Sequence, residues 1–193
     1  FKKAVSYNPR NVKYQRNLAG ALIEKGNFAE SERTLKKALE LDPSHIETNY
    51  MMANVKYQLS KPGEGLTYAK KAVNGDPKSK LYNYQLGLIY EALHDLDNAE
   101  RYYKEAIKID PDYASALTNL GIIYKNAGFY DQALTLLRRA YSLEEDNYMV
   151  NNNLGSIYIL QDKYADSIPY LEKAVALKPR EKDPRFNLAI RPN

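Results

Sequence analysis

Small and large apolar residues are arranged along this chain in a pattern that repeats every 34 positions. Within the stretch 118–140, Gly121, Ala133 and Ala140 interrupt large apolar residues that recur at helical spacing. Along the whole chain, alanines recur at the same interval, at Ala4, Ala38, Ala72, Ala106, Ala140 and Ala174. Prolines form a second series, at Pro9, Pro43, Pro77, Pro111 and Pro179, which Glu145 interrupts. Independent series that share one period predict an array of structural repeats.

The period divides the chain into five full units, with the end of a repeat before them and the start of a sixth after them. The fragment is 1–11, the full units are 12–45, 46–79, 80–113, 114–147 and 148–181, and the last start is 182–193. Each unit predicts two amphipathic helices separated by a turn, for example 82–93 and 97–109. The second helix ends before a proline, which cannot continue it. No segment alternates with the period of a strand, so the sequence predicts an all-α fold without a sheet.

Two kinds of position have a structural explanation. Helices approach each other closely only where the side chains at their crossing are small. We therefore expect Gly121, Ala133 and Ala140 to mark crossings, which makes them and the large apolar residues that pack around them in the stretch 118–140 scaffold and not a binding site. Gly26 and Gly128 stand in turns and suit the left-handed conformation that follows a helix.

Unit 46–79 departs most from the others. Lys56 replaces an aromatic residue, Pro62 stands in the expected turn, and Gly65 and Ala69 replace larger residues or better helix formers. Glycine inside a helix costs about 1 kcal/mol relative to alanine. We therefore expect this unit to be the loosest. In unit 148–181, Pro169 falls early in a second helix, where a small kink can form.

The repeated pattern resembles the tetratricopeptide repeat (TPR) family across essentially the whole chain. The unit 80–113 matches the family pattern at Leu86, Gly87, Tyr90, Ala99, Tyr103, Ala106 and Pro111. The resemblance implies a right-handed α-α superhelical solenoid of helix–turn–helix units, which we expect to form a single TPR domain over 1–193. It also implies that the first helices line a concave groove that holds an extended peptide or a partner helix. Within this frame, Tyr90, Tyr103, Tyr124, Tyr130, Tyr158 and Tyr164 occupy expected core positions.

Two features of the groove-facing positions that the resemblance implies favour peptide binding. The first is a row of amides at the repeat spacing, broken by Met51: Asn17, Gln85, Asn119, Asn153 and Asn187. The row resembles the asparagine ladder of the TPR region of O-GlcNAc transferases, and amides can pair with a peptide backbone of any sequence. The alternative is that each amide bonds within its own repeat.

The second feature is a centre rich in tyrosine and aliphatic residues, which suit interfaces. The alternative is that these side chains pack between neighbouring first helices. Taken together, the two features predict a peptide-binding set of Asn17, Tyr50, Asn54, Tyr57, Tyr84, Gln85, Leu88, Asn119, Ile122, Asn126, Asn152 and Asn153. The dicarboxylate clamp of chaperone-binding TPR proteins has no equivalent, so we expect no binding of chaperone tails.

Composition narrows the function classes. The chain has no Cys, only His45 and His94 as histidines, and no phosphate-binding glycine motif, so we expect no enzyme activity, no cofactor and no metal. The net charge is +4, but residues 80–147 carry 7 basic and 11 acidic residues, a balance of −4. This acidic middle argues against nucleic-acid binding. No apolar run approaches the roughly 20 residues that span a bilayer, so we expect no direct membrane insertion.

The sequence therefore favours a non-catalytic scaffold for protein–protein interaction, whose partner is a protein or peptide. One alternative is the substrate-recruiting TPR arm of a larger enzyme such as a glycosyltransferase. Another is a self-assembling scaffold, since a solenoid with uncapped ends can form a homo-oligomer. The chain begins at Phe1 and not at Met, and we expect it to be a piece of a longer protein that is soluble and cytoplasmic.

Overall fold

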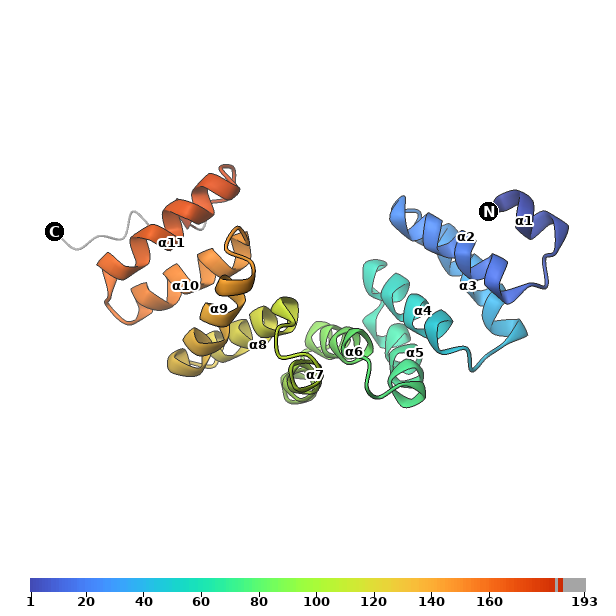
Figure 1. The fold of residues 1–193 in the computed structure, drawn as a ribbon, viewed down its shortest axis with the longest axis horizontal. Helices are drawn as coiled ribbons and strands as arrows, with labels where there is room; N and C mark the ends of the chain where they lie inside the picture. The colour runs from blue at the N-terminus through green and yellow to red at the C-terminus, as the bar shows by residue number, and fades with distance from the viewer. Residues whose placement is uncertain (183, 186–193) are drawn as a thin grey trace. The chain divides into compact units, whose positions relative to one another are not determined.

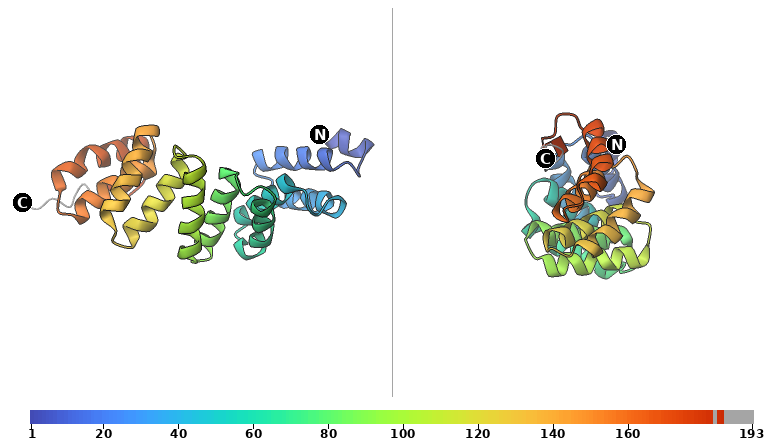
Figure 2. Two further views of the ribbon diagram at one scale, coloured as in Figure 1. Left: turned by 60° about the horizontal axis from the view of Figure 1, so that its bottom comes forward. Right: turned by 90° about the vertical axis from the view of Figure 1, so that its left-hand side faces the viewer.

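The computed structural model describes residues 1–182 and 184–185, and within them all regular secondary structure is α-helical, as predicted (Figure 1). The helices are α1 (Lys2–Tyr7), α2 (Val12–Glu24), α3 (Phe28–Leu41), α4 (Ile46–Gln58), α5 (Pro62–Gly75), α6 (Lys80–Ala92), α7 (Leu96–Ile109), α8 (Ala114–Asn126), α9 (Tyr130–Leu143), α10 (Tyr148–Leu160) and α11 (Tyr164–Leu177). Each predicted repeat thus forms one helix pair, and the two helices of a pair lie side by side (Figure 2). Most of the expected sixth repeat, Asn187 included, lies outside the described residues.

The chain forms two compact units, and the single TPR domain over 1–193 stays a prediction. Unit 1 spans Phe1–Ile109 and contains α1 to α7, and unit 2 starts at Asp110 and contains α8 to α11. Within unit 1 the first helices α2, α4 and α6 contact one another in succession, and in unit 2 α8 contacts α10. The surface that these first helices present in each unit is called the first-helix face below.

Small residues hold the two helices of each pair close together, as the sequence predicted. A Cβ atom added at Gly121 of α8 would lie 2.7 Å from Cγ of Leu137 on α9. The same addition at Gly155 of α10 would lie 2.5 Å from Cγ of Leu171 on α11. Both leucines are fully buried, and so is Ala140. The glycines therefore provide the space in which the partner helix buries its large residue.

A series of buried amides that the sequence analysis missed bonds four of the five full repeats to the turn before them. Gln15, Asn49, Asn83 and Asn151 recur at the repeat spacing. Their side-chain nitrogens donate to the backbone carbonyls of Pro9, Pro43, Pro77 and Glu145, over distances of 2.7, 3.1, 3.0 and 2.7 Å. In the repeat 114–147, Leu117 occupies the equivalent position. Because a buried amide needs hydrogen-bond partners, these four side chains hold the inter-repeat turns in place through the carbonyls that accept from them.

The turn inside each helix pair uses a left-handed residue. Gly26 and Gly128 have φ angles of 72° and 82°, which confirms the expectation for both glycines. Ser60, His94 and Asp162 occupy the same repeat position and have φ angles of 57°, 60° and 60°. A side chain in this conformation is unfavourable, so three of the turns keep a geometry that would suit glycine better.

In the repeat 46–79, residues that depart from the repeat pattern accommodate one another. Lys56 on α4 is 3% exposed, and its Nζ lies 2.9 Å from Oε1 of Glu32 on α3 and also contacts the carboxylate of Glu64 on α5. A Cβ at Gly65 would lie 3.2 Å from the Lys56 Cβ, so the glycine makes room for the lysine stem. Pro62 is the first residue of α5 and not a turn residue, and this position tolerates proline because its N–H has no helical partner.

The expected core tyrosines divide into two groups. Tyr90, Tyr103 and Tyr158 are buried, as predicted. The other three, Tyr124, Tyr130 and Tyr164, are only half-buried. The ring of Tyr90 stacks on Tyr102 and that of Tyr158 on Tyr170, with centroids 5.6 and 5.7 Å apart, so a half-buried tyrosine of the second helix covers each of these two buried rings. Helix α11 runs through Pro169 without interruption.

Candidate peptide-binding site

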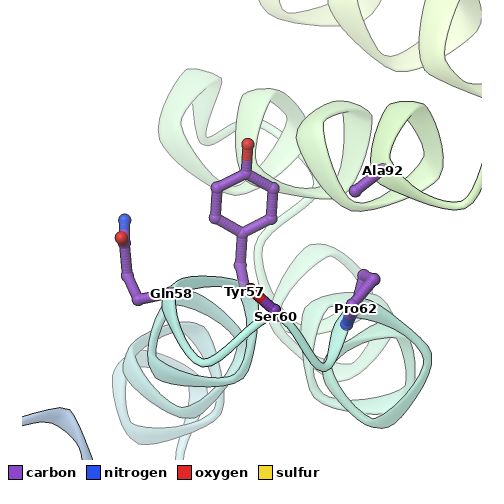
Figure 3. A pocket seen from close by; sticks show the side chains of 5 residues that line it. All are labelled: Tyr57, Gln58, Ser60, Pro62 and Ala92. Atoms are coloured by element: carbon purple, nitrogen blue, oxygen red, sulfur yellow. The ribbon is translucent and has the colours of Figure 1, made fainter.

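A pocket of about 470 Å³ opens on unit 1 where α4 ends, α5 begins and α6 ends (Figure 3). Its lining residues are Tyr57, Gln58, Ser60, Pro62 and Ala92. The ring of Tyr57 projects from α4 toward α6, which carries Ala92 (Figure 3). Tyr57 belongs to the peptide-binding set that the sequence predicted, and Gln58 follows it in the chain.

The local sequence explains why the pocket exists. Leu59 ends α4, and the left-handed Ser60 turns the chain so that α5 can start at Pro62. On α6, Ala92 contributes only a methyl group to the lining of the pocket. The pocket therefore combines an aromatic ring and two small apolar groups with the polar ends of Tyr57, Gln58 and Ser60.

The polar groups of this pocket are available to a ligand. Tyr57 is half-buried and Gln58 is exposed. Within the described residues neither side chain makes a hydrogen bond or an ion pair. A phenol can donate and accept, and an amide offers two donors and an acceptor. The pocket can thus hold a neutral or weakly polar group of a peptide and pair with its backbone.

Two other predicted tyrosines are partly scaffold. The ring of Tyr50 packs against Tyr82 of the next first helix, with 5.0 Å between the centroids. Burial raises the pKa of the Tyr50 hydroxyl above its ordinary value. Tyr84 lies against the fully buried Tyr103, with 5.7 Å between the centroids. Tyr50 thus packs between neighbouring first helices, as the alternative describes, whereas Tyr84 packs against the second helix of its own pair.

The predicted amide row is not uniformly exposed. Gln85 and Asn153 are only 5% and 7% exposed, and the Nδ2 of Asn153 donates to the Met149 carbonyl at 2.7 Å. The alternative that these amides bond within their own repeat thus describes Asn153. The Nε2 of Gln85 is buried and has no hydrogen-bond partner among the residues that the structure describes. Asn17 and Asn119 are half-buried.

The remaining predicted residues divide between the two units. Asn54 and Leu88 of unit 1 are half-buried, and so are Ile122 and Asn152 of unit 2. Asn126, at the end of α8, is exposed. The predicted set is therefore present on the first helices of both units, with most of its members only partly accessible.

Charged contacts on the first-helix face escaped the sequence analysis. In unit 1, Nη1 of Arg16 lies 3.0 Å from Oε2 of Glu47 and 3.1 Å from Nε2 of His45. In unit 2, Nζ of Lys125 donates to Oδ1 of Asn153 at 2.6 Å. The repeat spacing itself gave no signal for these pairs, because each joins different repeat positions.

The described residues contain no group of three or more His, Cys, Asp or Glu side chains that could hold a metal ion. Among the helices in that part of the chain, none has the length and apolar character needed to cross a membrane.

Comparison with known proteins identifies the family. Models of the tetratricopeptide repeat match residues 1–55, 77–146 and 118–182. The chain belongs to the tetratricopeptide repeat family. No curated protein sequence matches the chain significantly.

Solved structures share the fold at low sequence identity. YrrB, described as a TPR protein with an unusual peptide-binding site, is 21% identical, with 98% of this chain and 97% of YrrB covered and a TM-score of 0.76. PilW, a type IV pilus biogenesis factor, is 19% identical, with 97% and 87% covered and a TM-score of 0.84. MamA of Desulfovibrio magneticus RS-1 is 18% identical, with 88% and 96% covered and a TM-score of 0.76. These similarities establish the fold, a solenoid of TPR units.

Proposed function

We propose that this chain is a non-catalytic protein-interaction scaffold, which binds an extended peptide or a partner helix on its first-helix faces. The observation that carries the proposal is the pocket at Tyr57. It lies at the end of a first helix, it joins two adjacent repeats, and the side chains of Tyr57 and Gln58 have polar groups without partners in the described residues. An aromatic side chain with a polar tip is the type of residue that dominates binding at interfaces.

The sequence at these positions supports the same function. Scaffold positions repeat the same chemistry in every unit, as the alanine series shows. By contrast, the position equivalent to Tyr57 is occupied in the other full repeats by Ile23, Glu91, Lys125 and Ile159. Side chains that need not pack the repeat can differ from unit to unit, and a surface with varied chemistry can recognise one partner sequence. The peptide-binding site described for the TPR protein YrrB, which shares the fold, supports the proposal that this chain binds a peptide.

The test is a selection from a randomised library of extended peptides on the intact chain. The peptides enriched on the wild-type chain are then measured by fluorescence anisotropy on the double variant Tyr57→Ala/Gln58→Ala. We expect the affinity to fall about tenfold or more, because truncation of a central interface aromatic typically costs over 1 kcal/mol. Tyr7→Ala is the matched control, since Tyr7 is 89% exposed on α1 and lies outside the pocket.

Two results would count against the proposal. One is a selection in which no peptide is enriched above a control surface. The other is an enriched peptide that binds the double variant and the Tyr7→Ala control equally well. Circular dichroism of each variant shows that the helical content is retained, so that a loss of binding reflects the surface.

A further inference from the structure

The first-helix face of unit 2 contains a cation with unusual surroundings. Lys125 belongs to the last turn of α8 and is half-buried. Its Nζ donates to Oδ1 of Asn153 on α10, at 2.6 Å. The amide of Asn153 is held in this orientation because its Nδ2 donates to the Met149 carbonyl of the same helix, at 2.7 Å. The ammonium group is therefore held in one place on the face by an amide that is itself fixed.

Lys125 differs from three other buried or partly buried cations, because no carboxylate in the described residues neutralises it. Arg16 pairs with Glu47, Lys56 pairs with Glu32 and Glu64, and Lys173 pairs with Asp146. Within the described residues Lys125 has no ion pair. An ammonium group has three donors, and the one contact to Asn153 leaves capacity for further acceptors.

Burial without a counter-charge makes the charged form of this lysine less favourable. Loss of hydration lowers the pKa of the Lys125 ammonium below its ordinary value. A carboxylate that approached the group would remove this penalty and would gain a charge-assisted hydrogen bond.

We propose that Lys125 recognises a carboxylate of the bound peptide, with Asn153 as the residue that positions its ammonium group. The proposal rests on the proposed function, since it assumes that the first-helix face of unit 2 binds a peptide. The carboxylate can come from an Asp or Glu side chain or from the peptide C-terminus, because both present the same acceptor. It differs from the two-carboxylate clamp of chaperone-binding TPR proteins, because one lysine meets one carboxylate.

The experiment uses synthetic peptide pools of one length that differ at a single fixed feature. The first pool has Glu at its central position and an amidated C-terminus. The second has Gln in place of the Glu, and the third has the central Gln with a free C-terminal carboxylate. We expect enrichment of the first or the third pool over the second on the wild-type chain, by about tenfold, which is the effect of one charge-assisted contact. Preference for the first pool assigns a side-chain acid, and preference for the third assigns the C-terminus.

Three variants attribute the effect to Lys125. Lys125→Gln keeps a donor for Asn153 and removes the charge, so we expect it to abolish the preference. Lys125→Arg keeps the charge and should retain the preference. Lys163→Met is the control, because Lys163 is exposed and its ammonium group contacts the side chain of Gln161, so the preference should be unchanged.

The outcomes separate this inference from the proposed function. Equal enrichment of all three pools on the wild-type chain would overturn the inference, while peptide binding itself would still stand. A preference for acid that persists in Lys125→Gln would also overturn it, because another cation would then be responsible. A fourth pool with central phosphoserine that outcompetes the Glu pool would assign a phosphate instead and overturn the carboxylate. If no pool is enriched at all, both the inference and the proposed function fail.

Discussion

The ion-pair network around Lys56 gives the sharpest quantitative prediction about the scaffold. Lys56 on α4 stands between Glu32 on α3 and Glu64 on α5. The perturbation is Lys56→Met, which keeps most of the side-chain volume and removes the charge. Met packs where the lysine stem packed, so the variant differs from the wild type mainly in electrostatics. Lys37→Met is the control, because Lys37 is exposed on α3 and has no partner in the described residues.

The magnitude follows from the pKa of Glu32. The hydrogen bond from Lys56, and after it that from Lys36, lowers the pKa of this carboxyl from 4.5 to about 2. A shift of this size converts to about 3 kcal/mol. Because Lys36 and Glu64 are 54% and 56% exposed at their side chains, solvent screening reduces this figure. We therefore expect Lys56→Met to lower the free energy of unfolding by about 1–2 kcal/mol at pH 7.

The dependence on pH distinguishes this electrostatic contribution from packing. Glu32 has a folded-state pKa that is depressed, so its contribution is fully present above about pH 4.5 and is lost as pH falls toward 2. With pKa values of 4.5 in the unfolded and about 2 in the folded state, only about two fifths of the Glu32 contribution to the free energy of unfolding remains at pH 3. The packing difference between Met and Lys does not change with pH. The wild-type advantage over Lys56→Met should thus shrink by about half between pH 7 and pH 3.

The assay is urea unfolding followed by circular dichroism at pH 7, 5, 4 and 3, with both variants measured in parallel. Lys37→Met should differ from the wild type by less than about 0.5 kcal/mol throughout. A wild-type advantage over Lys56→Met that stays constant from pH 7 to pH 3 would refute the reasoning. An NMR titration that finds the Glu32 carboxyl at its ordinary pKa would refute it directly.

Three further predictions concern the repeat scaffold. Gly128→Ala should lower the free energy of unfolding by about 1–2 kcal/mol through backbone strain alone, because φ is positive there and an added Cβ meets no atom within 4 Å. Gly63→Ala, in the exposed first turn of α5, should be neutral or stabilising, and thermal unfolding compares the stability of the two variants. Asn83→Ala should cost about 1–3 kcal/mol, because it removes hydrogen bonds to the carbonyls of Pro77 and Ser79, and unchanged stability would show that this amide is not a tie. Ala140→Leu should overpack a fully buried crossing and cost about 1–3 kcal/mol in chemical denaturation, while an unchanged midpoint would contradict the register.

The helix pairs could be predicted from the sequence because the scaffold positions repeat. Gly121 and Ala140 recur in register with their equivalents, and the helix crossing imposes small residues at both places. The left-handed turns were found where glycine marks them, at Gly26 and Gly128. At His94 the same turn has no glycine, so local chemistry gave no signal. Repeat register, and not residue type, identifies this position.

The site was harder to predict, because neighbouring positions on a helix face different directions. Asn151, Asn152 and Asn153 are consecutive, and each step along an α-helix turns the side chain by about 100°. The Asn151 side chain donates to the Glu145 carbonyl in the preceding turn, Asn152 is half-buried, and Oδ1 of Asn153 accepts from Lys125. From sequence alone, all three are amides of a first helix.

Contacts between repeats were the least predictable part. The pairing of Lys56 with Glu32 joins α4 to α3, and that of Arg16 with Glu47 joins α2 to α4. Such contacts depend on how adjacent repeats are rotated against each other, which a 34-residue period does not specify. The sequence therefore identified Lys56 as a departure from the pattern without finding the partners that stabilise it.

The most direct test of the central claim is a substitution that fills the pocket at Tyr57 by enlarging one of the side chains that line it. Ala92→Phe places a ring where the pocket lies, and Ala165→Phe makes the same change at an exposed position of α11. The measurement is the affinity, by fluorescence anisotropy, of the peptide that the wild-type chain selects. If the pocket binds the peptide, Ala92→Phe should weaken binding about tenfold or more, and Ala165→Phe should leave it unchanged. Equal affinity for both variants and the wild type would contradict the assignment of this face as the binding surface.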